Sequence, residues 1–137
     1  MDRDIFKSGR YFKISDFLTS HGQLLLRSNK TDEQKVNVDI IFFDTTYIQL
    51  TSSLYGIAVR VVDKKRAMDY NSLTSFLKYE HNHLFEIETE NGEKYYIAAS
   101  FVRVFENGLD FNETSLGVLQ YKGREKEIAS SLGDVSE

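Results

Sequence analysis

Residues 36–62 read VNVDIIFFDTTYIQLTSSLYGIAVRVV, and this stretch decides the class of fold. It contains three short apolar runs, which are separated only by polar residues at 44–46 and 51–53. Short runs rich in Val, Ile, Tyr and Phe between polar turn residues are typical of successive β-strands. Because local turns join these runs, we expect neighbouring strands to pair antiparallel, as in a meander.

The first of these runs changes character along its length. One face carries only apolar residues: Val36, Val38, Ile40 and Phe42. The other face begins with Asn37 and Asp39, but residues 41 and 43 on the same face are apolar. A strand end that is apolar on both faces has to be covered on both. We therefore expect residues 41–43 at the centre of the fold, beneath a helix or a second sheet.

The other two runs predict a short strand at 47–50 and a longer one at 54–62. In the longer strand, simple alternation places four residues on one face: Tyr55, Ile57, Val59 and Val61. The opposite face holds Gly56 and Ala58, whose small size indicates that another element approaches closely there.

The chain before residue 36 offers two more strands. Residues 1–9 are expected to be a loose lead-in, 11–14 a first short strand and 15–18 a turn of helix. Residues 23–28 form the second strand, and their three successive leucines imply burial on both faces. Residues 29–35 contain no apolar side chain and are predicted to form an exposed loop.

One short helix is predicted at 71–79. Asn71 or Ser72 can cap it, and an apolar stripe follows at helical spacing: Leu73, Phe76 and Leu77. This helix is a candidate to cover the doubly apolar strand end at 41–43.

Residues 84–104 are predicted to form a hairpin. Apolar and acidic residues alternate before Asn91-Gly92, a pair that tolerates the positive φ of a tight turn. The alternation shifts after Ser100, and a β-bulge there would explain the shift. The spacing of apolar residues at 98–105 also fits a helix, so strand and helix both stay open for that segment.

The remaining residues contain fewer strand signals. Residues 109–121 are expected to form one more strand or an irregular packed segment, and 122–137 a flexible tail or a short helix. Together these patterns predict a β-rich α+β fold with a single globular domain at 1–121. Its sheet is expected to be bent or a partly open barrel of six to eight short antiparallel strands, with one short packed helix.

Composition narrows the function. The 137 residues include 17 basic and 21 acidic residues, which give a net charge of −4, and no cysteine. The chain therefore has no disulfide or thiolate site, and it lacks the basic footprint of a nucleic-acid binder. No apolar segment reaches the ~20 residues that span a bilayer, and no signal peptide is recognised. We expect a cytoplasmic protein without nucleic-acid or membrane partners.

His81 and His83 are the candidate metal ligands. Residues two apart on a strand share a face, so both imidazoles could bind one transition metal ion. A third ligand is needed, and His21, Asp39 or Asp44 could supply it only if the fold brings one of them close. The opposing interpretation is a polar loop that leads into the hairpin.

No catalytic residue and no cofactor are predicted, because nucleophile and phosphate-loop motifs are absent. Glu86 and Glu88 share a strand face and are expected to be solvated, where they could meet a basic partner protein. The sequence thus favours a non-enzymatic protein-interaction module that neutralises or assembles with a partner. The alternative is a small-ligand or metal-binding β-barrel that uses His81 and His83, with enzyme activity left open. Self-association as a homodimer through a sheet edge is a third option.

Overall fold

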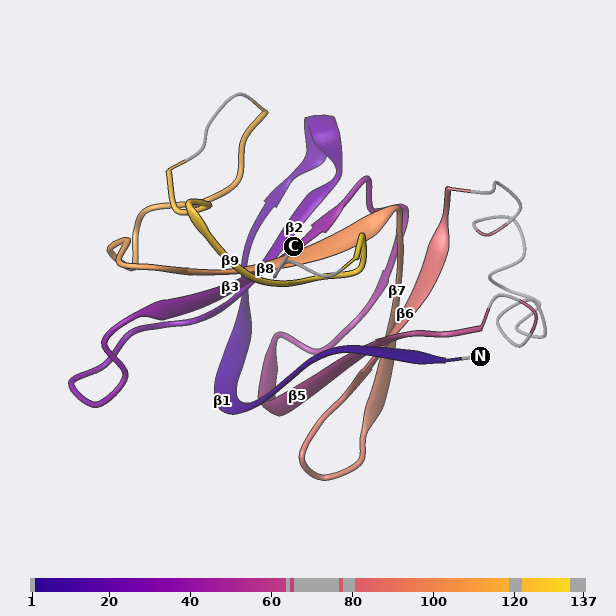
Figure 1. The fold of residues 1–137 in the computed structure, drawn as a ribbon, viewed down its shortest axis with the longest axis horizontal. Helices are drawn as coiled ribbons and strands as arrows, with labels where there is room; N and C mark the ends of the chain where they lie inside the picture. Colours follow the sequence, from indigo (N-terminus) through magenta and orange to yellow (C-terminus); the bar gives the residue numbers. More distant parts are fainter. Residues whose placement is uncertain (1, 64, 66–76, 78–80, 119–121, 134–137) are drawn as a thin grey trace.

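The computed structural model describes residues 2–63, 65, 77, 81–118 and 122–133. These residues form one antiparallel sheet with the strand order β4-β7-β6-β5-β1-β2-β3-β8-β9 (Figure 1). A 3₁₀ turn at Thr19–His21 joins β1 to β2. The strands are β1 (Arg3–Leu18), β2 (Gln23–Ser28), β3 (Asn37–Phe43), β4 (Tyr47–Gln49), β5 (Ser53–Val61), β6 (His83–Glu88), β7 (Lys94–Ala99), β8 (Phe101–Asn107) and β9 (Lys126–Ser130).

β1 is the longest strand and joins the two halves of the sheet. Its residues 3–13 pair with β5, and its residues 13–18 pair with β2. The strand curves strongly as it passes from one partner to the other (Figure 1). The sheet bends far enough that the Arg3 side chain donates a hydrogen bond to the backbone oxygen of Ser131, just after β9.

The chain builds the two halves in an interleaved order. β3 and β8 are paired in register from Asn37↔Asn107 to Phe43↔Phe101. The whole of β4, β5, β6 and β7 is inserted between these two partners. A local meander was predicted, but β4 pairs with β7 rather than with either of its neighbours in sequence.

The main core lies on the inner face of the curved sheet. It draws residues from every strand except β4 and β9, including Phe12, Ile40, Phe42, Ile57, Phe85 and Val104. Phe42 and Phe85 meet edge to face with ring centroids 5.5 Å apart. These two aromatics come from opposite halves of the sheet, so the inner face is one continuous core.

An irregular segment at 108–118 and 122–125, here the outer segment, covers the outer face of β2, β3 and β8. Leu116 packs there against Leu25, Ile41 and Phe105. The prediction that residues 41–43 need a second cover is therefore supported for Ile41. The cover, however, is neither a helix nor a second sheet.

A buried polar cluster fastens the outer segment. Arg27 and Asp39, directly opposite on β2 and β3, form a bidentate ion pair at 2.6 and 2.8 Å with both side chains fully buried. Asp39 also accepts hydrogen bonds from the Ser115 hydroxyl at 2.7 Å and the Asn107 amide at 2.9 Å. The Arg27 guanidinium donates to the Glu113 backbone oxygen at 2.6 Å. Buried charges of this kind are tolerated when each is paired and hydrogen-bonded.

A backbone irregularity at Gly56 overturns the predicted facing of Tyr55, whereas Ile57, Val59 and Val61 share a face as predicted. Gly56 has a φ of 77°, a left-handed conformation that suits glycine. The left-handed residue breaks the alternation of β5, so Leu54, Ile57 and Val59 face the core while Tyr55 is exposed. A Cβ at Gly56 would lie 3.0 Å from the Cβ of Glu90, which confirms the close approach expected there.

Several other boundaries differ from the prediction. Residues 3–9 are strand rather than a loose lead-in, and 15–18 continue that strand instead of forming a helical turn. The shift after Ser100 is not a bulge, because β7 ends there and β8 begins with a new partner. Residues 101–105 are therefore strand. The tail, expected to be flexible or helical, contains β9.

The β-rich part of the predicted fold is confirmed, with nine strands instead of six to eight. The described residues contain almost no helix, so the α+β assignment is not confirmed. Apart from Leu77, the helix predicted at 71–79 lies outside the described residues. Leu77 is buried against Val62, Leu84 and Ala98 on the outer face of β5, β6 and β7.

Candidate functional site

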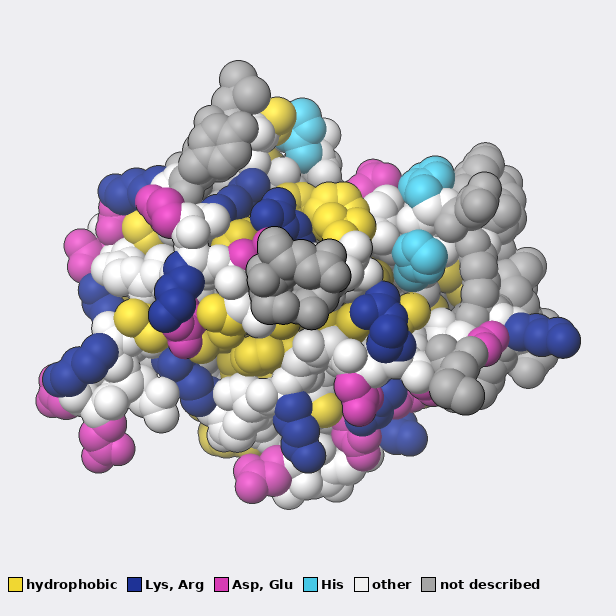
Figure 2. Space-filling model, viewed as in Figure 1, with side chains coloured by type: hydrophobic (Ala, Val, Ile, Leu, Met, Phe, Trp, Pro, Cys, Tyr) yellow, Lys and Arg dark blue, Asp and Glu magenta, His cyan; other side chains and the backbone are white. Residues whose placement is uncertain are grey.

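The two candidate metal ligands occupy different local structures. His83 is the first residue of β6, paired with Ala99, and alternation places it on the face of Phe85. His81 precedes the strand, so the strand spacing assumed for the pair does not apply. The Nε2 atom of His81 lies 3.9 Å from the Oδ2 atom of Asp44, and both side chains are exposed. Histidine side chains reach the molecular surface on the face shown in Figure 2.

Asp44 is thus the candidate third residue that the fold brings to His81. It adopts a left-handed backbone conformation with a φ of 55°, and its Oδ2 atom accepts a hydrogen bond from Ser100 at 2.9 Å. Asp39 lies instead in the buried cluster with Arg27. Within the described residues, no group of three or more His, Asp or Glu side chains is arranged to hold a metal ion.

The predicted solvated acidic face is wrong for Glu86. Its side chain is only 4% exposed, and its carboxylate accepts from Arg60 at 2.6 Å. Arg60 also contacts Glu88 at 3.0 Å and Asp4 at 3.2 Å. The hydrogen bonds with these carboxylates raise the pKa of Arg60. Most of the acidic charge that suggested a basic partner is therefore engaged within the sheet.

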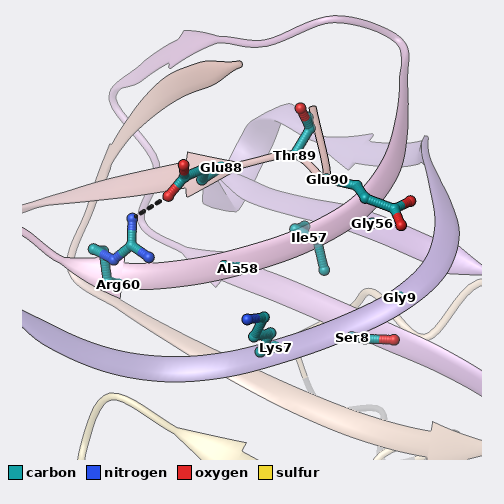
Figure 3. A pocket seen from close by; sticks show the side chains of 10 residues that line it. All are labelled: Lys7, Ser8, Gly9, Gly56, Ile57, Ala58, Arg60, Glu88, Thr89 and Glu90. Carbon is teal, nitrogen blue, oxygen red and sulfur yellow. Dashed lines mark hydrogen bonds and ion pairs between the residues drawn. The ribbon is translucent and has the colours of Figure 1, made fainter. Parts of the chain in front are cut away.

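A surface pocket of about 430 Å³ opens beside this ion network, where the register of β1 against β5 shifts. Gly9 and Gly56 form part of its wall. In Figure 3, Lys7 extends from β1 toward β5, while Glu88 reaches Arg60. The pocket is lined by both positive and negative side chains, which gives it no single preference for charge.

A pair of exposed tyrosines lies next to this pocket. Tyr11 and Tyr55 are cross-strand partners with ring centroids 4.8 Å apart. They remain 45% and 65% exposed, although the neighbouring residues Phe12 and Leu54 are buried in the core. Exposed tyrosines offer large contact area with a polar tip, and such residues are enriched in protein interfaces.

Three cations on β1 flank the tyrosine pair. Lys7, Arg10 and Lys13 form no ion pair with any of the described residues. By contrast, Arg27, Arg60 and Arg103 each contact at least one carboxylate. We call Lys7, Arg10, Tyr11, Lys13 and Tyr55 the basic–aromatic face.

The basic–aromatic face was missed in the sequence because simple alternation put Tyr55 on the side of Ile57 and Val59. Gly56 was the available signal, since an isolated glycine within a strand often marks a bulge. Lys7, Arg10 and Lys13 are three residues apart, which does not match the two-residue repeat of a regular strand, and the register of β1 shifts between Ser8 and Tyr11.

Comparisons with protein-family models, curated proteins and solved structures find no match for this chain. Among the residues that the structure describes, no helix is long and apolar enough to cross a bilayer. Functional inference therefore rests on the two sites just described.

Proposed function

We propose that this protein is a non-enzymatic protein-interaction module that binds its partner through the basic–aromatic face of β1 and β5. The exposed Tyr11–Tyr55 pair is the observation that carries the proposal. Tyrosines at the centre of an interface commonly contribute a large share of the binding free energy. The two rings also belong to central strands of the sheet, so the fold holds them in place before a partner binds.

The main core supports an interaction role over an enclosed ligand site. The inner face of the sheet is filled by buried side chains from both halves, including Phe12, Phe42 and Phe85. The pocket at Gly56 lies at the surface rather than inside the core, and its Glu88 carboxylate already accepts a hydrogen bond from Arg60. Small substrates bind mostly in enclosed apolar pockets. An open, polar surface such as this one is better suited to contact with another macromolecule.

Affinity capture with purified protein tests this function. We expect a dominant partner that is recovered with the parent protein and lost with Tyr11→Ala and Tyr55→Ala. Phe111→Ala is the matched control, because Phe111 is an aromatic side chain, 84% exposed, on the outer segment instead of β1 or β5. Titration calorimetry with the purified partner should show a loss of at least about tenfold in affinity for each tyrosine variant. Equal affinity for the tyrosine variants and the control would exclude the basic–aromatic face.

A metal or small-ligand site at His81 and His83 is the second candidate. Its supporting observation is the Asp44 carboxylate beside His81, held by Ser100 and by a left-handed backbone. Metal analysis of the purified protein distinguishes the two candidates. Stoichiometric metal that disappears in the His81→Ala/His83→Ala variant would favour the metal site over the interaction module. A metal-free protein would exclude the metal site.

A further inference from the structure

A second pocket lies beside Tyr11 and shares no lining residue with the pocket at Gly56. It has a volume of about 250 Å³ and is lined by Arg10, Tyr11, Lys13, Ser28, Asn29, Thr31 and Gln34. Its two charged side chains are both positive, and the remaining polar ones are hydroxyls and amides. Its lining therefore differs in charge from that of the pocket at Gly56, where Glu88 and Glu90 accompany the cations.

Arg10 gives this pocket a positive charge, and no carboxylate of the described residues forms an ion pair with it. Its Nε atom donates to the Ser28 hydroxyl at 2.9 Å, and its Nη2 atom donates to three backbone oxygens, the shortest contact being 2.8 Å to Val36. All these partners are neutral. Partial burial lowers the pKa of Arg10, and Glu106 acts in the opposite direction. The Glu106 carboxylate, however, is already paired with Lys126 at 2.8 Å.

The hydrogen bonds of Arg10 also leave it a free donor. Its Nη1 atom makes no hydrogen bond to the described residues, whereas the other two guanidinium nitrogens are occupied. Lys13 lines the same pocket and has no ion-pair partner there. Two cations without an ion-pair partner among the described residues, beside neutral hydrogen-bonding groups, form a suitable environment for a carboxylate, because charge-assisted hydrogen bonds are the stronger class.

We propose that the pocket at Arg10 binds a carboxylate side chain from an acidic segment of the partner protein. An apolar residue next to that carboxylate packs on the Tyr11–Tyr55 pair, which adjoins the pocket through Tyr11. The inference rests on the proposed interaction function and specifies the charge of the partner, which is opposite to the basic partner expected from the sequence. Charge complementarity with Lys7, Arg10 and Lys13 is its basis.

A single-stranded nucleic acid fits these observations less well. Such partners need a track of cations along the phosphate backbone and several aromatic rings on which successive bases stack. Here there are three cations and one aromatic pair, whose rings are tilted by 42°.

Fluorescence anisotropy with short labelled peptides tests the inference. The probe alternates glutamate with leucine, and its control replaces every glutamate with glutamine. We expect the glutamate peptide to bind with an affinity that falls as salt is added, and the glutamine peptide to bind at least about tenfold more weakly. Equal binding of the two peptides would overturn the inference.

Variants locate the binding site. Lys13→Glu is the main variant, because Lys13 makes no hydrogen bond or ion pair within the described residues and the fold does not depend on it. Lys13→Glu should weaken the affinity for the glutamate peptide by about fivefold or more. Lys94 is an exposed lysine on β7, and Lys94→Glu should leave that affinity unchanged. Arg10→Lys should retain part of the affinity that Arg10→Met loses. Unaltered binding by Lys13→Glu contradicts the proposed site.

The same variants separate this inference from the proposed function. If the captured partner binds Lys13→Glu normally but loses affinity for Tyr55→Ala, the proposed interaction function is supported and the inference that the partner supplies an acidic segment is wrong. Tighter binding of an oligothymidine than of the glutamate peptide would also overturn the inference. So would self-association in sedimentation experiments that Lys13→Glu abolishes, because the occupant would then be a second copy of this chain.

Discussion

At the scale of single residues, Asp39 shows most clearly how a polarity pattern can mislead. Its position at the start of a half-apolar strand indicated a solvent-facing side chain, yet it is fully buried. The alternation in the strand was identified correctly, but the partners of Asp39 were not visible. Arg27 comes from the preceding strand and Ser115 from a segment far along the chain, so only the tertiary fold brings them together.

Asp39→Asn should strongly destabilise the protein. The substitution leaves the buried Arg27 guanidinium without a counter-charge, and breaking one side of a buried ion pair costs about 3–5 kcal/mol. Urea unfolding followed by circular dichroism measures the loss. Asp110→Asn is the control, because the Asp110 side chain is 74% exposed and should change stability by less than about 0.5 kcal/mol. Similar effects of the two substitutions would show that the cluster does not fasten the fold.

The tyrosine pair is a second case at this scale. Tyr11 and Tyr55 could be assigned to strands from the sequence, but their shared exposed position depends on the register shift in β1 and on the left-handed Gly56 in β5. A bulge inserts a single residue and reverses the facing of everything beyond it. The candidate interface could therefore not be predicted from alternation alone, because a register change of one residue decides whether the two tyrosines share an exposed face.

At the scale of elements, strands bounded by clear turn residues were predicted well. β2 has the predicted limits, and the β6–β7 hairpin turns at Asn91-Gly92 as expected. β1 was underestimated, since its first residues alternate poorly and the register shifts break the pattern. β9 was missed because its five residues, KEIAS, carry little strand propensity and depend on pairing with β8.

The outer segment supplies a pH-dependent contact that can be tested at this scale. Glu113 and Lys122 form an exposed ion pair, and the hydrogen bond from Lys122 is the main cause that lowers the pKa of Glu113. A depressed carboxyl pKa contributes stability above the pKa of the unfolded chain. That contribution is lost as pH falls through the pKa of the folded state.

Lys122→Met should therefore raise the pKa of Glu113 toward its ordinary value. A carbon-detected NMR titration of the Glu113 carboxyl measures this directly. Lys126→Met serves as the control, since Lys126 pairs with Glu106 and not with Glu113. An unchanged titration midpoint in Lys122→Met would mean that the ion pair does not form in solution. At pH values below the folded-state pKa, the parent and Lys122→Met should converge in stability.

At the scale of the whole molecule, the sequence indicated a bent antiparallel β fold but not its strand order. Local turns favour sequential pairing, and the prediction followed that tendency. The structure departs from it because β3 and β8 pair across an insertion that contains four strands. Such long-range pairing is decided by burial of both faces of β3, for which the apolar residues at 41 and 43 were the only local sign.

Because one core spans both halves, the protein should unfold as a single unit. Phe12 lies on β1 and is fully buried in that core. Phe12→Ala should cost about 3–5 kcal/mol and should lower the hydrogen-exchange protection of β3 and β6 together. Tyr11→Ala, the exposed neighbour on the same strand, is the control. Retained protection in only one of the two strands would reveal independently stable halves.

The central place of β1 has a practical consequence for protein engineering. Four strands lie on each side of it in the sheet, and β2 follows it before the exposed loop at 29–36. A cut in that loop would give a small hairpin fragment, β1 with β2, and a large fragment that lacks the two strands between β5 and β3. Each piece then carries edges that only the other can complete. The chain thus offers the design of a two-part complementation reporter, in which reassembly restores both the sheet and the tyrosine pair.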